Sequence, residues 1–309
     1  MSWALASQAV TARVRVPATS GNLGPGFDSL GLAYQLYDEV AATIVAGPTT
    51  VTVTGEGAGE VPLDENHLVL RAMRRTFEFA GAPQPNLQLV CHNRIPHGRG
   101  LGSSASAVVA GIAAARALLP GPEVITQQQI LELATEFEGH PDNAAPAIYG
   151  GATTSWMENG KPFAVQIPVS SEVYPFLLVP SNSLATKAAR AVLPSEIPFA
   201  DAVFNVGRIA LLTQALSTHP QLLFPATEDK LHQPYRASVM PESAAVVTNL
   251  RSKGNPAVVS GAGPTVLVFG TFADTVDNLA ESAQLDLNKW RILPLAVDKN
   301  GVQTTRELL

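Results

Sequence analysis

Residues 95–106 read Ile-Pro-His-Gly-Arg-Gly-Leu-Gly-Ser-Ser-Ala-Ser and limit the fold more than any other segment. Residues 87–91, just before them, alternate between apolar and polar side chains, which is typical of a β-strand. Residues 107–119, just after them, are almost wholly alanine, valine, isoleucine and leucine, which indicates a buried helix. The segment is therefore predicted to be a loop that joins a strand to the N-terminus of a helix.

The composition of this loop favours an anion as its ligand. Gly98, Gly100 and Gly102 let the backbone turn tightly and approach a ligand closely. The free N–H groups of the first helical turn and the positive end of the helix dipole would face that ligand. Such a geometry binds phosphate. The hydroxyls of Ser103 and Ser104 can cap the helix and reach a metal ion.

The loop also fits other interpretations. A plain glycine turn with a serine cap needs no ligand at all. A dinucleotide-binding fingerprint fits Gly100-x-Gly102-x-x-Ala105, but it requires an acidic residue at the end of a second strand about 20 residues further on. That position falls in Pro-Gly-Pro-Glu at residues 120–123, a loop after a helix, so the fit fails. A Walker A loop needs a Gly-Lys-Ser/Thr ending, which is absent here.

Composition narrows the class of protein. The chain has 309 residues, enough for one large or two medium domains, and 46% of them are hydrophobic. The net charge is −6 and the basic residues are dispersed, which argues against nucleic acid or an anionic membrane as a partner. The single cysteine, Cys91, rules out a disulfide framework. No run of 18 apolar residues occurs and residues 1–7 lack a basic signal region, so a cytoplasmic protein is expected.

Hydrophobic patterning predicts the main elements. Strands are expected at residues 10–16, 38–45, 50–54, 87–91, 174–179, 266–269 and 290–297, with a hairpin at residues 152–156 and 163–167. Asn66 is expected to cap a helix that ends at Gly81, and Thr126-x-x-Gln129 to form a capping box for a helix that stops at Gly139. A long helix is expected over residues 199–216. The order of elements indicates an α+β protein.

Polar residues gather in two further segments of the first half. The segment at residues 17–32 carries Asn22 and Asp28 in Pro-Ala-Thr-Ser-Gly-Asn-Leu-Gly-Pro-Gly-Phe-Asp, and either a ligand site or a long turn with Asx caps would explain it. Glu138 begins Glu-Gly-His-Pro-Asp-Asn. It lies at a helix C-terminus, where the dipole disfavours it unless a cation such as Mg²⁺ is near. A solvated glutamate remains the alternative, and so does Glu132 as the metal ligand.

The segment at residues 17–32, the loop at residues 96–105 and the segment Ala-Val-Val-Ser-Gly-Ala-Gly-Pro-Thr at residues 257–265 resemble the three motifs of the GHMP kinases in their order along the chain. Residues 17–32 and 138–143 resemble in particular the homoserine kinase branch. The resemblance implies a two-domain α+β fold, with a ribosomal S5 domain 2-like N-terminal domain (1–168) that binds ATP and a ferredoxin-like C-terminal domain (169–309). It also implies ATP and Mg²⁺ as cofactors, and the phosphorylation of L-homoserine to O-phospho-L-homoserine, a step toward threonine.

The resemblance assigns roles residue by residue. The ATP loop comprises Pro96, His97, Gly98, Arg99, Gly100, Leu101, Gly102, Ser103, Ser104, Ala105 and Ser106, and the metal is held by Ser104 and Glu138. Catalysis involves Asn143, Asp142 and Glu138, where either Asp142 or Asn143 assists the hydroxyl. The substrate contacts are Asn22, Asp28, His140, Thr186, Arg190, Arg236 and Gly261. The alternatives are another GHMP kinase, such as a mevalonate-type enzyme, an inactive nucleotide-binding regulator, or an oxidoreductase. The sequence does not decide whether the protein forms a homodimer.

Homoserine is a zwitterion, so most of its recognition must come from two charges. Arginine holds a carboxylate best, because its planar fork donates two parallel hydrogen bonds. Arg190 and Arg236 lie in separate second-half segments and are expected to bind the carboxylate. Asp28 is expected on the opposite side, where it takes the ammonium group. Phosphoryl transfer needs positioning more than a strong base. We therefore expect a rate that is nearly flat with pH between roughly 7 and 9.

Overall fold

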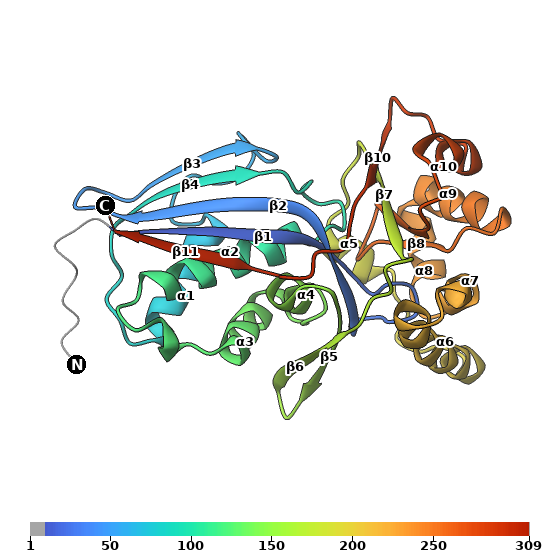
Figure 1. Cartoon of the computed structure of the whole chain (residues 1–309), viewed down its shortest axis with the longest axis horizontal. Coiled ribbons are helices and arrows are strands. Elements are labelled where there is room, and N and C mark those ends of the chain that lie inside the picture. The colour runs from blue at the N-terminus through green and yellow to red at the C-terminus, as the bar shows by residue number, and fades with distance from the viewer. Residues whose placement is uncertain (1–9, 309) are drawn as a thin grey trace.

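The computed structural model describes residues 10–308, so residues 1–7, which lack a basic signal region, lie outside the described residues. The chain forms two lobes side by side (Figure 1). The larger lobe contains a seven-stranded sheet in the order β11-β1-β2-β4-β3, from which β5 and β6 branch at β2. Its strands are β1 (Val10–Gly21), β2 (Leu30–Ile44), β3 (Thr50–Gly55), β4 (Leu87–Asn93), β5 (Ala152–Glu158), β6 (Lys161–Ile167) and β11 (Gln303–Leu308).

Helices cover one face of this sheet (Figure 1), and the alternation of buried valines with exposed Arg13 and Arg15 in β1 follows from that. They are α1 (Leu68–Phe79), α2 (Ser103–Leu118), α3 (Gln127–Glu138) and α4 (Ala144–Tyr149), with the short turn η1 (Pro122–Val124). Helix α2 is buried almost all round, as its composition predicted. At Gly111 it approaches α1 so closely that a Cβ would lie 2.5 Å from the carbonyl oxygen of Val69. The phosphate loop therefore leads into a helix that is buried and closely packed.

The smaller lobe has a four-stranded antiparallel sheet in the order β10-β7-β9-β8. The strands are β7 (Tyr174–Pro180), β8 (Ala257–Val259), β9 (Val266–Gly270) and β10 (Trp290–Pro294). The helices are α5 (Thr186–Ala191), α6 (Phe199–Ser217), α7 (Leu223–Ala226), α8 (Gln233–Arg236), α9 (Pro241–Ser252) and α10 (Val276–Ala283), with the turns η2 (Pro220–Leu222) and η3 (Ala237–Val239). Strand, helices, two strands, helix and strand follow one another, as in a ferredoxin-like fold.

Several boundaries differ from the predictions. β1 runs past Pro17, because the register shifts between Pro17 and Ala18 and an irregularity tolerates proline. Asn66 does not cap α1, whose N-cap is His67. Neither Ser103 nor Ser104 caps α2, because Gly102 occupies the N-cap. The capping box of Thr126 and Gln129 is confirmed.

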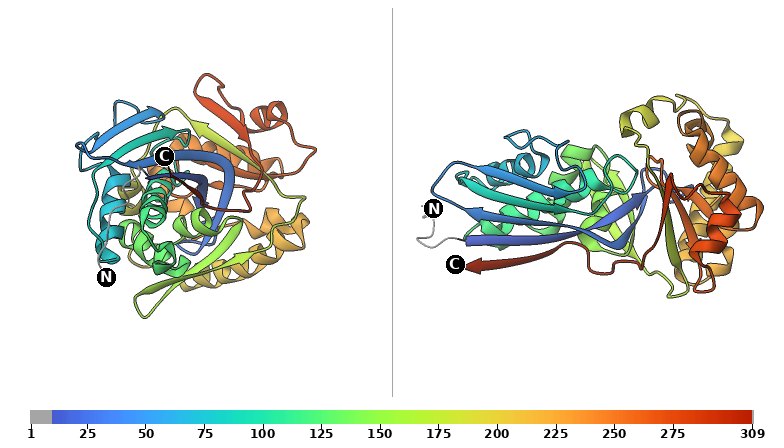
Figure 2. Two further views of the ribbon diagram at one scale, coloured as in Figure 1. Left: turned by 60° about the vertical axis from the view of Figure 1, so that its left-hand side comes forward. Right: turned by 90° about the horizontal axis from the view of Figure 1, so that it is seen from above.

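The last strand leaves the smaller lobe. Between β10 and β11 the chain returns to the large sheet, where β11 pairs antiparallel with β1 from Val10↔Leu308 to Arg15↔Gln303. The two further views in Figure 2 show this strand lying along the outer side of the first strand. A division at residue 168 stays a prediction, but the second lobe is not continuous to residue 309, because β11 belongs to the first sheet.

Candidate functional site

The three glycine-rich segments meet where the two lobes touch. The Asn22 side chain donates to the carbonyl oxygen of Gly261 at 2.7 Å, and the N–H of Gly261 donates to that of Gly21 at 3.1 Å. The hydroxyl of Ser260 donates to the carbonyl oxygen of Gly100 at 2.6 Å. Parts of the chain up to 240 residues apart are thus joined by backbone-directed hydrogen bonds. The contact fixes one wall of a cavity.

The phosphate loop has the geometry that its sequence predicted. Gly98, Gly100 and Gly102 all lie in the left-handed region, with φ of 62°, 72° and 68°. Helix α2 begins at Ser103, directly after Gly102, so the N–H groups of its first turn point out of the helix end. A Cβ on Gly102 would collide with the hydroxyl of Thr19. Only glycine therefore allows this approach.

Two cavities meet at Ser103 and Ser104. One, of about 310 Å³, is lined by most of the predicted site residues, namely Asn22, Asp28, Gly98, Gly100, Gly102, Ser103, Ser104, Glu138, His140, Asp142, Asn143, Thr186, Arg190, Arg236 and Gly261. The other, of about 250 Å³, lies beside α1 and is more apolar, with Val61, Pro62, Leu68 and Val69 in its walls and His97 at its edge. The loop therefore separates a polar cavity from an apolar cavity.

Four of the predicted loop residues point elsewhere. Leu101, Ala105 and Ser106 are buried, and the Ser106 hydroxyl donates to the carbonyl oxygen of Pro17 at 2.9 Å. The Arg99 guanidinium donates to the carbonyl oxygens of Pro180 and Ser181 at 3.0 and 2.6 Å, which ties the loop to the smaller lobe. These side chains hold the loop in place and do not reach either cavity. Pro96 is also buried and lines neither cavity.

Glu138 lies in front of the N-terminus of α2. The Ser104 hydroxyl donates to its Oε1 at 2.6 Å, and burial raises the pKa of the carboxyl despite that hydrogen bond. Glu138 is at the unfavourable end of α3, but it faces the positive end of α2, which offsets the repulsion. No arginine or lysine pairs with it within residues 10–308. Glu132 accepts from Gln128 at 3.3 Å and lines neither cavity, whereas Glu138 lines the polar one, and Glu138 stays the predicted metal ligand.

A short chain of polar side chains starts at His140. Its Nδ1 lies 2.5 Å from Oδ1 of Asp142, and the same oxygen accepts from the amide of Asn143 at 3.3 Å. The Asn143 oxygen accepts from the Thr19 hydroxyl at 3.0 Å. Burial alone would lower the pKa of His140, but the hydrogen bond and charge of Asp142 outweigh it, and the net shift is upward. Asp142 is thus a buried carboxylate that is hydrogen-bonded to His140.

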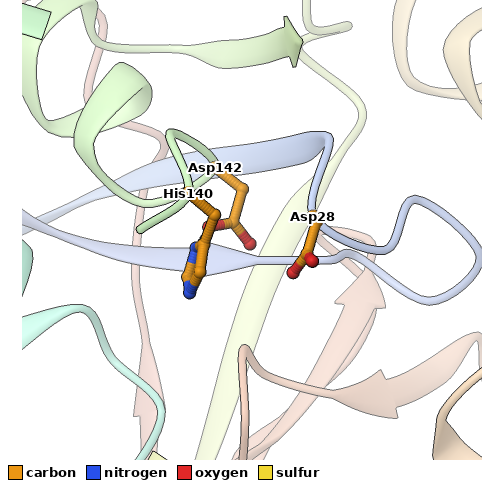
Figure 3. A group of neighbouring side chains, drawn as sticks. All are labelled: Asp28, His140 and Asp142. Carbon is orange, nitrogen blue, oxygen red and sulfur yellow. The ribbon is translucent and has the colours of Figure 1, made fainter. Parts of the chain in front are cut away.

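Asp28 and Arg190 are not on opposite sides of the cavity as expected. They form a bidentate pair, with Nη2 to Oδ1 at 2.6 Å and Nη1 to Oδ2 at 3.0 Å. Asp28, His140 and Asp142 lie close together (Figure 3), with one ligand atom of each within 4.8 Å of the others. Because Arg190 already neutralises Asp28, this cluster resembles a charge-paired amino-acid site more than a metal centre.

Arg236 differs from Arg190 in its surroundings. It is 1% exposed, and its Nε and Nη1 donate to the carbonyl oxygens of Ala189 and Gly261 at 3.2 and 3.1 Å. Its Nη2 has no hydrogen-bond partner, and no carboxylate lies within ion-pair distance in the described part of the chain. A buried cation without a counter-ion is costly, and burial lowers the pKa of Arg236 accordingly. The free edge of this guanidinium is where an anion would compensate.

The patterns in the sequence did not single out Thr19, Phe27, Asp38 or His232. Asp38 accepts from the N–H groups of Arg94 and Ile95 at 2.7 and 2.9 Å and so holds the start of the phosphate loop. Thr19 supports Asn143, and the ring of Phe27 lies 5.3 and 5.4 Å from the guanidinium carbons of Arg190 and Arg236. For Thr19 and Phe27 the only signal was their place inside the segment at residues 17–32.

Comparisons with known proteins agree with this geometry. The profile described as "GHMP kinases N terminal domain" matches residues 67–151. A homoserine kinase of Streptomyces coelicolor is 49% identical over 96% of this chain and 95% of its own, and one of Clavibacter michiganensis is 52% identical over 94% and 92%. The chain belongs to the GHMP kinase family. Within it, these relatives place the chain in the homoserine kinase branch.

Solved structures of GHMP kinases extend the likeness. A homoserine kinase from Cytophaga hutchinsonii superposes with a TM-score of 0.85 at 26% identity, covering 96% of this chain and 97% of that one. A mevalonate diphosphate decarboxylase from Staphylococcus aureus has a TM-score of 0.69 at 15% identity, which shows the fold alone. The two-domain α+β fold expected of a GHMP kinase is thereby confirmed.

Proposed function

We propose that the protein transfers the γ-phosphoryl group of ATP to the side-chain hydroxyl of L-homoserine, giving O-phospho-L-homoserine and ADP for threonine biosynthesis. One observation carries the proposal. The cavity in front of α2 contains two arginines and a carboxylate, Arg190, Arg236 and Asp28, a set that matches an α-amino acid. When homoserine binds, its ammonium group pairs with Asp28 and its carboxylate pairs with the two arginines. These two ion pairs replace the one between Asp28 and Arg190.

The nucleotide fits the two adjoining cavities. The apolar cavity beside α1 suits the adenine base, and the N-terminus of α2 suits the phosphates. Mg²⁺ prefers oxygen ligands, and the Ser104 hydroxyl with the unpaired carboxylate of Glu138 supplies two at the helix mouth. We assign Mg²⁺ to these two residues. A bound Mg²⁺ neutralises charge on the transferring phosphate.

The residues around the acceptor position the hydroxyl. Asn143, fixed by Thr19 and Asp142, orients the attacking oxygen in front of α2. Asp142 is hydrogen-bonded to His140. It therefore accepts the proton of the homoserine hydroxyl only as the phosphoryl group leaves ADP. Strong base catalysis is not required. The N–H groups of α2 hold the transferred group during the step.

ADP release from MgATP tests the substrate class. The panel is L-homoserine, L-threonine, mevalonate and galactose, each at equal concentration. Homoserine should be the strongly preferred acceptor, because mevalonate lacks the ammonium group that Asp28 requires. Preference for mevalonate would point to another GHMP kinase, and no turnover with any acceptor despite ATP binding would indicate an inactive regulator.

A homodimer belongs to the same proposal. Helix α6 exposes Phe199, Val203 and Val206, which are 83%, 56% and 68% exposed and lie on one face with Ala210. This stripe carries no charge, so two copies can meet across it without the repulsion expected from a net charge of −6. Residues 10–308 contain no helix long and apolar enough to cross a membrane. The cytoplasm, where ATP is supplied, is the proposed location.

A further inference from the structure

His232 lies behind Arg236 and touches no cavity wall. It is fully buried in the loop before α8. Asp229 fixes this loop, because its carboxylate accepts from the N–H groups of Leu231, His232 and Gln233 at 2.8, 3.1 and 2.7 Å. The histidine can therefore not move without unwinding the start of α8.

Both ring nitrogens of His232 are used, and their partners fix the tautomer. Nε2 lies 2.8 Å from the carbonyl oxygen of Gly24, so it must carry the proton and donate. Nδ1 lies 3.1 Å from Nη1 of Arg236 and must therefore accept. A doubly protonated ring would set an N–H against a guanidinium N–H. Burial and the neighbouring Arg236 lower the pKa of His232 although the Asp229 carboxylate, 3.6 Å from Nε2, acts to raise it, and the net downward shift favours the neutral ring.

These two bonds connect the two ends of the amino-acid site. Gly24 belongs to the loop that carries Asn22 and Asp28, whereas Arg236 belongs to the smaller lobe. The ring of Phe27 stacks on that of His232, with centroids 5.2 Å apart and planes at 30°. His232 thus holds the residue that meets a carboxylate at a fixed distance from the loop that meets an ammonium group.

We propose that His232 is a positioning residue for the amino-acid site, and that its Nδ1 aims the free Nη2 of Arg236 at the substrate carboxylate. The proposal rests on the function proposed above. It predicts that the benefit of a carboxylate on the acceptor depends on the acceptor atom at Nδ1. Catalysis on an acceptor without a carboxylate should depend on it much less.

Two variants separate the ring nitrogens. His232→Asn keeps an acceptor near Nδ1 but no donor toward Gly24, and His232→Gln keeps a donor near Nε2 but no acceptor toward Arg236. Each is assayed for kcat/KM with L-homoserine and with 3-aminopropan-1-ol, which is homoserine without its carboxylate. The ratio of the two values does not depend on how much of the protein is folded.

In His232→Gln the ratio should fall about 10- to 100-fold, because a hydrogen bond to a charged group is lost. In His232→Asn it should stay within about threefold, and the KM for MgATP should be unchanged in both. An unchanged ratio in His232→Gln, or an equal fall in both variants, would overturn the proposal. Wild-type protein that does not phosphorylate homoserine would instead refute the proposed function.

Discussion

At the scale of single residues, the two arginines of the site have different tasks. Arg190 lies on the short helix α5, is 41% exposed on its side chain, and pairs with Asp28 in the absence of substrate. Arg236 is immobilised by backbone oxygens and lacks a counter-ion among residues 10–308. We therefore expect substrate entry to displace Arg190 and to leave Arg236 in place.

Arg236→Met should lower kcat/KM for homoserine by about 2–5 kcal/mol, since a buried charge loses its partner. Arg190→Met should lower kcat/KM for homoserine by less than Arg236→Met does, because it also removes the Asp28–Arg190 pair, which must break when the substrate binds. The KM for MgATP should not move in either. Initial rates with each substrate varied separately measure this, with Arg13→Met, an exposed arginine on β1, as the control. Unaltered homoserine kinetics in both variants would refute the amino-acid site.

The Glu138→Gln variant tests the metal site. Loss of one anionic oxygen ligand should lower kcat by orders of magnitude and shift the Mg²⁺ requirement upward. Glu132→Gln is the matched control, because Glu132 lies on the same helix but outside both cavities. Mg²⁺ titrations at saturating ATP distinguish the two. Full activity of Glu138→Gln at low Mg²⁺ would show that another group holds the ion.

His140 makes the stability of the protein depend on pH. Its pKa is raised in the folded state, so the stabilisation that it brings is complete below its unfolded pKa of about 6.5 and is lost as pH rises through the folded value. Melting temperatures of wild type and His140→Gln, measured from pH 6 to 9, should therefore converge at high pH. A constant difference would contradict this.

The flat pH profile of kcat between roughly 7 and 9 stays a prediction. A steep single-proton rise in kcat across that range would indicate a general base.

At the scale of elements, the helix α2 and its entry loop form the proposed phosphate site. Gly102 is the N-cap, and Thr19 and Asn143 close in on it from two other segments. The loop therefore depends on contacts that join distant parts of the chain, while its hydrogen-bonding groups come from local backbone geometry.

Gly102→Ala should weaken ATP binding at least tenfold, because the new methyl group displaces Thr19 beside the phosphates. Gly81→Ala is the control. Gly81 has φ +64 against +68 at Gly102, but open space surrounds its Cβ position, so it shares the backbone strain without the collision. Isothermal titration with ATP measures both. Equal ATP affinity in the two folded variants would show that backbone strain alone matters there.

Local signals predicted these elements well. The alanine-rich helix, the capping box at Thr126 and the hairpin of residues 152–156 and 163–167 all depend on neighbours close in the sequence, and the structure confirms them. Helix α4 was missed, although proline fits its first turn, where the N–H is not needed. The Asp28–Arg190 pair joins residues 162 positions apart. No local pattern reveals such a contact, or the place of His232 behind Arg236.

At the scale of the whole molecule, the site lies between the lobes, and the α6 stripe lies on the smaller one. The hairpin β5–β6, which packs against α6, exposes Trp156, Met157 and Val165 as well. A single helix face buries less than the roughly 800 Å² per partner of a standard interface. Both elements would thus need to contribute to a dimer.

Val206→Glu should convert a dimer into monomers, because it places a charge in the centre of an apolar contact. Gln84→Glu adds the same charge to an exposed position of the larger lobe and should leave the assembly intact. Sedimentation velocity over a range of concentrations measures the mass. A wild-type protein that is monomeric at all concentrations, or a dimer that survives Val206→Glu, would refute this interface.

The pairing of β11 with β1 also affects how the protein folds while it is being translated. A ribosome releases the chain from its N-terminus onward, at about 5–20 residues per second. β1 emerges first, yet its outer neighbour consists of residues 303–308, the end of the described chain. The edge of the ATP-binding lobe therefore stays open until residues 303–308 have been made. Until then, a nascent chain would keep that strand available to chaperones or to another nascent chain.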